Sequence, residues 1–144
     1  MIKRVYIAGP LFSYGEKEFN KKIDKYIHTL GFETFLPQRD GYMLADALAD
    51  AKGGIDASNL IFNKDLDEIK RCDIVVFIMD GRVPDEGACV EIGLAYAYGK
   101  ECIGFKSDTR YLMDGMDNPL IFGALKGRIA RSSEDLKKYL QELL

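Results

Sequence analysis

Apolar and polar residues alternate along this chain with two different periods. Short runs that are almost wholly apolar, several of them ending at Gly or Pro, predict buried β-strands. Longer segments with apolar residues every three or four positions predict amphipathic helices. The expected strands are residues 3–8, 32–36, 73–79, 101–105 and 128–132, and the expected helices are residues 16–30, 57–71, 86–99 and 133–144, with a short helix within 38–54.

This alternation of strands and helices indicates the class of fold. Strands that are apolar on both faces are typical of a parallel sheet covered by helices on both sides. The sequence therefore predicts a single doubly wound α/β domain over residues 1–144, with a five-stranded parallel sheet of the flavodoxin-like or Rossmann-like type. Residues 106–126 are expected to be irregular. Ligands bind such sheets beyond the carboxyl ends of the strands, here the loops after Gly9, Leu36, Met79 and Phe105.

Composition narrows the possible partners. The 144 residues are 47% hydrophobic, enough for a core that needs no disulfides or metal. Twenty basic and 23 acidic residues are mixed along the chain and give a net charge of −3, so no nucleic-acid partner is expected. The opening segment MIKRVYIAGP resembles neither a signal peptide nor a membrane span. We expect a cytoplasmic protein without membrane contact.

Several kinds of catalytic chemistry have no support in the sequence. Cys72, Cys89 and Cys102 are widely spaced and never form CxxC, so neither a disulfide framework nor a zinc site is expected. His28 is the only histidine, which removes Ser-His-Asp and Cys-His catalysis. The AGPLFSYG loop lacks both GxGxxG and a Walker lysine. No cofactor or metal is expected, and acid–base work falls to carboxylates and tyrosines.

Glu91 is the most conspicuous of these carboxylates. Between Gly87 and Gly99 it is the only side chain charged at neutral pH, one turn into an otherwise apolar helix. A carboxylate in such a place needs a partner or a function, and the positive end of the helix dipole favours its ionised form. An ionised, positioned carboxylate is a nucleophile. Composition alone favours the alternative, a capping or solvent-facing glutamate.

Neighbouring residues also have two interpretations each. Asp85 is placed to cap the helix, yet it borders the expected ligand crevice. Tyr6 lies near the carboxyl end of the first strand, as a core tyrosine or as a hydrogen-bond donor to a carboxylate. Phe12 follows in the next loop, where it plugs the edge of the core or stacks on a flat ring. Gly87 permits close approach of a ligand or of backbone.

Three segments, taken together, resemble a known family. They are Val5–Phe12 (VYIAGPLF), Asn63–Leu66 (NKDL) and Asp85–Gly93, which has the form D-x-G-x-x-x-E-x-G. Their order and spacing are similar to those of the nucleoside 2-deoxyribosyltransferases. The resemblance extends from Tyr6 to at least Asn118, and the acidic-glycine-glutamate motif is its most specific part.

The resemblance implies a covalent mechanism. Glu91 would attack the anomeric carbon of a 2'-deoxynucleoside and expel the base, and a second base would then take the sugar from the deoxyribosyl-glutamate, as in retaining glycosyl transfer. Tyr6 would orient Glu91, and Asp65 would contact the base and assist its protonation. The structural alternative for Asp65 is an exposed residue of the KDLDEIK helix.

The resemblance also implies a substrate class and an assembly. Asp85 would lie near the sugar 5' end, where a carboxylate accepts a hydrogen bond from a hydroxyl but repels a phosphate, so 2'-deoxynucleosides and free nucleobases are the expected partners in nucleoside salvage. Asn118 would reach the site of a neighbouring subunit in a dimer-based homo-oligomer. The expected substrate contacts are Asp85, Gly9, Phe12, Gln38, Gly87 and Asn118.

Two other functions remain open at this stage. An N-glycosidase would hydrolyse 2'-deoxynucleosides or their 5'-monophosphates with the same Glu91, and water would replace the acceptor base. A sensor of nucleotide derivatives would keep the crevice without catalysis. The joint presence of Tyr6, Asp65, Asp85 and Glu91 argues against the sensor.

Overall fold

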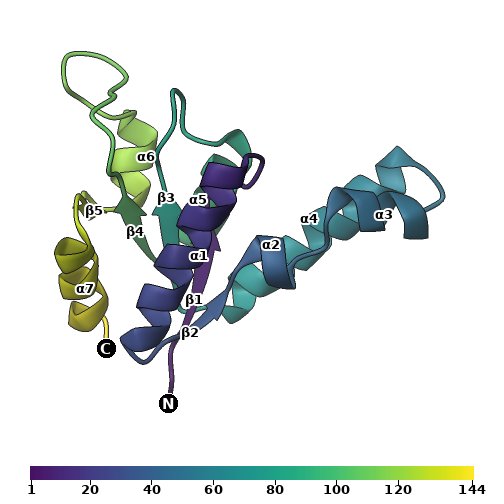
Figure 1. The fold of residues 1–144 in the computed structure, drawn as a ribbon, viewed down its shortest axis with the longest axis horizontal. Coiled ribbons are helices and arrows are strands. Elements are labelled where there is room, and N and C mark those ends of the chain that lie inside the picture. Colours follow the sequence, from purple (N-terminus) through teal and green to yellow (C-terminus); the bar gives the residue numbers. More distant parts are fainter.

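A computed structural model describes residues 1–144 as an α/β fold with five strands and seven helices (Figure 1). No helix is long and apolar enough to cross a membrane. The strands are β1 (Arg4–Ala8), β2 (Glu33–Phe35), β3 (Ile74–Ile78), β4 (Glu101–Phe105) and β5 (Ile129–Ala130). The helices are α1 (Tyr14–Thr29), α2 (Pro37–Asp40), α3 (Leu44–Asp50), α4 (Gly54–Arg71), α5 (Glu86–Ala97), α6 (Pro119–Ala124) and α7 (Ser133–Glu142).

The strands form one sheet in the order β2-β1-β3-β4-β5. Every neighbouring pair is parallel, which confirms the predicted doubly wound sheet. The strand order reverses between β1 and β3, and ligands of such sheets bind outside the carboxyl ends of the strands at this point. The loops β1–α1 and β3–α5 therefore frame the expected crevice.

Alternate residues of the strands face two separate cores, as a period of two requires. Val5 and Ile7 of β1 belong to the core beneath α1 and α7, with Ile23, Ile27, Leu136 and Leu140. Tyr6 and Ala8 belong to the opposite core beneath α4, α5 and α6, with Ile69, Ala88, Ile92 and Ile121. This alternation places the Tyr6 side chain on the face of the sheet that α4 and α5 cover.

Four features of the helices differ from the sequence expectation. α1 begins before Glu16, because Ser13 and Glu16 form a reciprocal capping box. α4 begins at Gly54 instead of residue 57 and packs along α3, and this helical pair projects away from the sheet (Figure 1). α2 forms one short turn after β2. α6 lies within the segment expected to be irregular, where Asn118 caps it.

Candidate active site

The N-terminus of α5 is built from Asp85 and the small residues that follow it. Asp85 Oδ2 accepts a hydrogen bond of 2.8 Å from the Ala88 backbone N–H and so caps the helix. Ala88 and Ile92 are buried against the sheet. Since only Oδ2 is used by the cap, the other carboxylate oxygen of Asp85 is left for a second partner.

Glu91 follows the cap residue Asp85 by six positions, a little under two helical turns. Its side chain is partly buried, and Oε2 is shielded from solvent without a hydrogen-bond partner. The hydroxyl of Tyr6 is likewise buried and unpartnered, although it is close enough to Glu91 to lower the pKa of that carboxyl. The two groups face each other without a well-formed hydrogen bond, and a small movement of either side chain would let the Tyr6 hydroxyl donate to the Glu91 carboxylate.

Asp65 of α4 completes a cluster with Tyr6 of β1 and Glu91 of α5. Burial raises the pKa of Tyr6 well above its usual range, and the negative charges of Glu91 and Asp65 raise it further. Tyr6 is fully buried, whereas Asp65 and Glu91 as whole residues are half-buried. The structure thus brings together three residues from separate segments, the outer two of which are 85 positions apart in the chain.

Both carboxyl groups of this cluster hold their protons more tightly than usual. Burial raises the pKa of Glu91 to about 8; the Tyr6 hydroxyl opposes this rise, and the charges of Asp65 and Asp85 add to it. Burial also raises the pKa of Asp65 to about 6, against the lowering effect of Lys64. Two neighbouring carboxyl groups with separated pKa values are typical of paired acid and base roles.

The loop after β1 offers one exposed aromatic side chain and one tightly packed glycine. Phe12 is 77% exposed, so its ring is free to contact a ligand. A Cβ atom on Gly9 would lie 3.0 Å from Ile78 Cβ, closer than carbon atoms normally approach. Gly9 is therefore explained by the close approach of β1 and β3. Gly87 has a similar explanation, because a Cβ there would lie 3.3 Å from Asp85 Oδ2.

Gln38 of α2 is held by α1. Its Nε2 donates to the Lys17 carbonyl at 2.9 Å, and its Oε1 accepts from Asn20 Nδ2, also at 2.9 Å. Asn20 is 4% exposed, and sequence patterning did not identify it as a site residue. It lies three residues before Ile23, on the buried face of α1, and this position is the signal that would have identified it.

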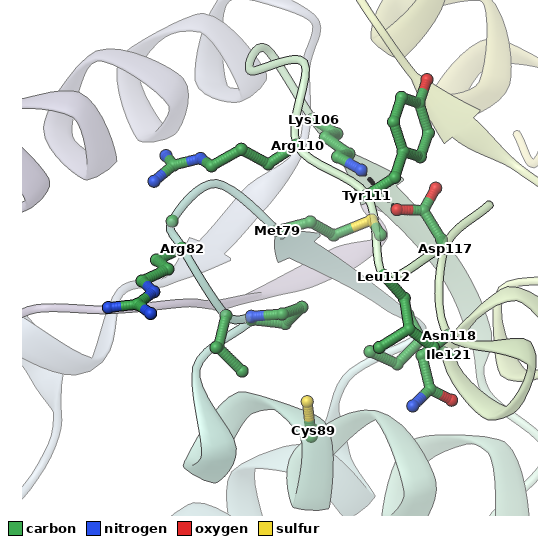
Figure 2. Close-up of a pocket in the computed structure, with 13 residues that line it drawn as sticks. Met79, Arg82, Cys89, Lys106, Arg110, Tyr111, Leu112, Asp117, Asn118 and Ile121 are labelled. Atoms are coloured by element: carbon green, nitrogen blue, oxygen red, sulfur yellow. Dashed lines mark hydrogen bonds and ion pairs between the residues drawn. The ribbon is translucent and has the colours of Figure 1, made fainter. Parts of the chain in front are cut away.

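A cavity of about 360 Å³ lies on another side of the α5 N-terminus (Figure 2). Its lining includes Cys89 and Asn118 but neither Glu91 nor Tyr6. Asn118 Oδ1 accepts from the Leu120 backbone N–H at 2.9 Å, which leaves the Asn118 amide NH₂ for other partners. Within one chain, Asn118 therefore lines a cavity beside the Glu91 cluster and does not join that cluster.

A buried ion pair supports the wall of this cavity. Lys106, at the end of β4, is 3% exposed and pairs with Asp117 (Figure 2). Its ammonium group lies 3.9 Å from the centre of the Tyr111 ring. The pair precedes Asn118 directly and fixes the segment that carries it. Sequence patterning missed this pair, because Lys106 and Asp117 belong to a stretch without helical or strand periodicity.

The sequence and the fold resemble those of known proteins. The model of the nucleoside 2-deoxyribosyltransferase family matches residues 5–139. No curated protein has a significant match to the sequence. A 2-deoxyribosyltransferase of Bacillus psychrosaccharolyticus superposes with a TM-score of 0.77 at 24% identity, over 97% of this chain and 95% of that one.

Two further solved structures have the same fold. The 2-deoxyribosyltransferase of Leishmania mexicana gives a TM-score of 0.65 at 23% identity, over 97% of both chains. The CMP N-glycosidase of Clostridium botulinum gives 0.56 at 21% identity, over 96% of this chain and 99% of that one. The family match spans all three residues of the Tyr6, Asp65 and Glu91 cluster. The chain belongs to the nucleoside 2-deoxyribosyltransferase family.

Proposed function

We propose that the protein transfers 2-deoxyribose from a 2'-deoxynucleoside to a free nucleobase, by double displacement through Glu91. The observation that carries this proposal is the cluster of Glu91, Tyr6 and Asp65 beside the switch point of the sheet. It places a desolvated carboxylate next to a hydroxyl donor and a second carboxyl group. These are the groups that a retaining transfer between two bases requires.

In the first displacement, a Glu91 oxygen bonds to C1' of the deoxyribose while the C1'–N bond breaks. The electron pair of that bond passes to the base nitrogen, which takes a proton from Asp65. The Tyr6 hydroxyl donates to the Glu91 carboxylate and holds the attacking oxygen in one direction. The products are a deoxyribosyl ester of Glu91 and a neutral base.

The second displacement reverses these roles. A nitrogen of the incoming base attacks C1', the ester bond to Glu91 breaks, and the proton lost by that nitrogen passes to Asp65. Two inversions at C1' retain the configuration of the nucleoside. Exclusion of water from the ester favours transfer over hydrolysis.

Transfer is tested by incubating the protein with deoxyinosine and adenine and separating the products by chromatography. We expect deoxyadenosine and hypoxanthine in equal amounts. Free deoxyribose without deoxyadenosine would show that the protein is an N-glycosidase instead. Binding of deoxyinosine without any turnover would identify a sensor and would exclude both enzymatic functions.

We infer that Asp85 selects free nucleosides, with one carboxylate oxygen in the helix cap and the other facing the 5'-hydroxyl. Asp85→Asn keeps a cap acceptor but removes the charge. We expect it to raise kcat/KM for deoxynucleoside 5'-monophosphates, relative to free nucleosides, by about tenfold or more. Asp85→Ala should also lower the free energy of unfolding by about 1 kcal/mol. An unchanged ratio in Asp85→Asn would exclude this role.

We also infer that the active unit is a homo-oligomer in which Asn118 enters a neighbouring site through its free amide NH₂. Exposed apolar side chains surround this residue and the start of α5, including Val90, Leu120 and Phe122. Such a surface at the mouth of a cavity is typical of an interface between subunits.

Subunit mixing tests this arrangement. Glu91→Ala and Asn118→Ala proteins should each be nearly inactive, and co-refolding them in equal amounts should restore about one quarter of the wild-type sites in a dimer with shared sites. If Asn118 served the site of its own chain, each mixed dimer would carry one defect per site. The mixture would then remain inactive.

A further inference from the structure

Four groups form an unbroken series of hydrogen bonds between the β1–α1 loop, α1 and α2. Asn20 Nδ2 donates to the Pro10 carbonyl at 2.8 Å and to Gln38 Oε1 at 2.9 Å. Gln38 Nε2 in turn donates to the Lys17 carbonyl at 2.9 Å. The series thus joins the loop after β1 to the helix after β2, and both segments border the carboxyl edge of the sheet.

The two ends of the series fix the orientation of both amides. The Pro10 and Lys17 groups are carbonyls, which only accept hydrogen bonds. If the Asn20 amide turned over, its Oδ1 would face two other acceptors, the Pro10 carbonyl and Gln38 Oε1. If the Gln38 amide turned over, its oxygen would face the Lys17 carbonyl, and its NH₂ would face the Asn20 NH₂. The orientation observed is therefore the one in which every contact pairs a donor with an acceptor.

Gln38 still has unused hydrogen-bonding capacity. A primary amide has two N–H donors and two lone pairs on oxygen, and the series uses one of each. The second N–H and the second lone pair remain, and Asn20 and the Lys17 carbonyl together fix which of them lies on which side. The edge of a nucleobase is sensitive to the positions of this donor and this acceptor. Adenine and cytosine present an amino donor beside a ring acceptor. Hypoxanthine and uracil present an oxo acceptor beside a ring N–H.

We propose that Asn20 is a specificity-determining positioning residue: together with the Lys17 carbonyl it sets the direction of the Gln38 amide, and it thereby contributes to the preference for amino-bearing or oxo-bearing bases. The proposal rests on the function proposed above, since it assigns Gln38 to the base. Asn20 itself does not touch the substrate. It is buried, and its remaining Oδ1 has no partner.

The test replaces Asn20 by aspartate, which has the same shape but cannot donate to Gln38 when ionised. In the Asn20→Asp protein the Gln38 amide is expected to turn over, because a charge-assisted hydrogen bond from its NH₂ to the new carboxylate outweighs the lost contact with the Lys17 carbonyl. Two ratios of kcat/KM are measured by competition in one vessel: deoxyadenosine over deoxyinosine, and deoxycytidine over deoxyuridine. We expect both ratios to move in the same direction by about tenfold.

Competition makes the result independent of folding yield, because both donors compete for the same folded molecules. Asn20→Ala, which leaves the Gln38 amide with the Lys17 contact alone, should move both ratios toward one. Gln38→Ala should do the same, and adding Asn20→Asp to it should change the ratios no further. Gln141→Ala, at an exposed position of α7, is the matched control and should leave both ratios unaltered.

The outcomes separate this inference from the proposed function. Unchanged ratios in an active Asn20→Asp protein would overturn the role of Asn20 while leaving the transferase intact. A further change in the Asn20→Asp/Gln38→Ala protein would show that Asn20 does not act through Gln38. A wild-type protein that converts none of the four donors would refute the proposed function itself.

Discussion

Replacing Glu91 by glutamine is expected to lower kcat by about 10⁴-fold or more and to make the protein more stable at pH 8. The loss of activity follows because the amide cannot form the deoxyribosyl ester. The gain in stability follows because the desolvated carboxylate of Glu91, whose pKa is raised to about 8 by burial, costs free energy in the folded state.

The size of this stability effect depends on pH. Between about pH 4.5 and 8 the folded protein keeps a Glu91 proton that the unfolded chain has released. Unfolding then releases a proton, so a rise in pH destabilises the wild type. The advantage of Glu91→Gln should be absent near pH 4, grow across this window and reach about 2–4 kcal/mol above pH 8.

Denaturant unfolding at pH 4.5, 6, 7 and 8.5 measures this effect in both proteins. Glu86→Gln, an exposed residue of the same helix, is the matched control and should alter neither kcat nor the pH dependence. A Glu91→Gln protein with wild-type turnover would remove Glu91 from the mechanism. A stability difference that does not change with pH would show that Glu91 is not desolvated.

The strands were predictable because burial on both faces leaves each strand as an apolar run between turn residues. The two-residue period within β1 also assigns Tyr6 to the face opposite Val5 and Ile7. α6 was missed because its Asn-Pro start lies in a stretch rich in Gly and Asp, and six residues are too few to show a helical period.

The candidate site was predictable in part. The lone charge of Glu91 is visible from sequence, but its proximity to Asp65 depends on how α4 packs against α5, which no local pattern specifies. Asn20 was missed although it lies on the buried face of α1, since a polar residue there does not reveal which loops it joins. The family motif supplied the roles that periodicity alone left undecided.

The coupled pKa values of Asp65 and Glu91 lead to the last prediction. The two carboxyl groups interact, so the values of about 6 and 8 describe the pair. Between these values the pair holds one proton, mainly on Glu91. The active arrangement, with Glu91 ionised and Asp65 protonated, is the minor form of this singly protonated pair, and its population follows the same two pKa values. The pH profile of kcat/KM for the wild type should therefore be bell-shaped, with its limbs near pH 6 and 8.

Asp65→Asn should lower kcat/KM by about 10²–10⁴-fold, because the leaving base loses its proton donor. Only Glu91 then titrates, and its pKa falls because a neighbouring negative charge is gone. The alkaline limb should disappear, and the rate should rise to a plateau as Glu91 ionises.

The loss of kcat/KM in Asp65→Asn should be smaller for 5-fluoro-2'-deoxyuridine than for deoxyuridine, since a more acidic base leaves without full protonation. Asp67 is exposed on the same helix, so Asp67→Asn is the matched control and should keep the bell-shaped pH profile. A bell-shaped profile in Asp65→Asn would show that another group protonates the base, and equal deficits for both donors would place Asp65 outside the cleavage of the glycosidic bond.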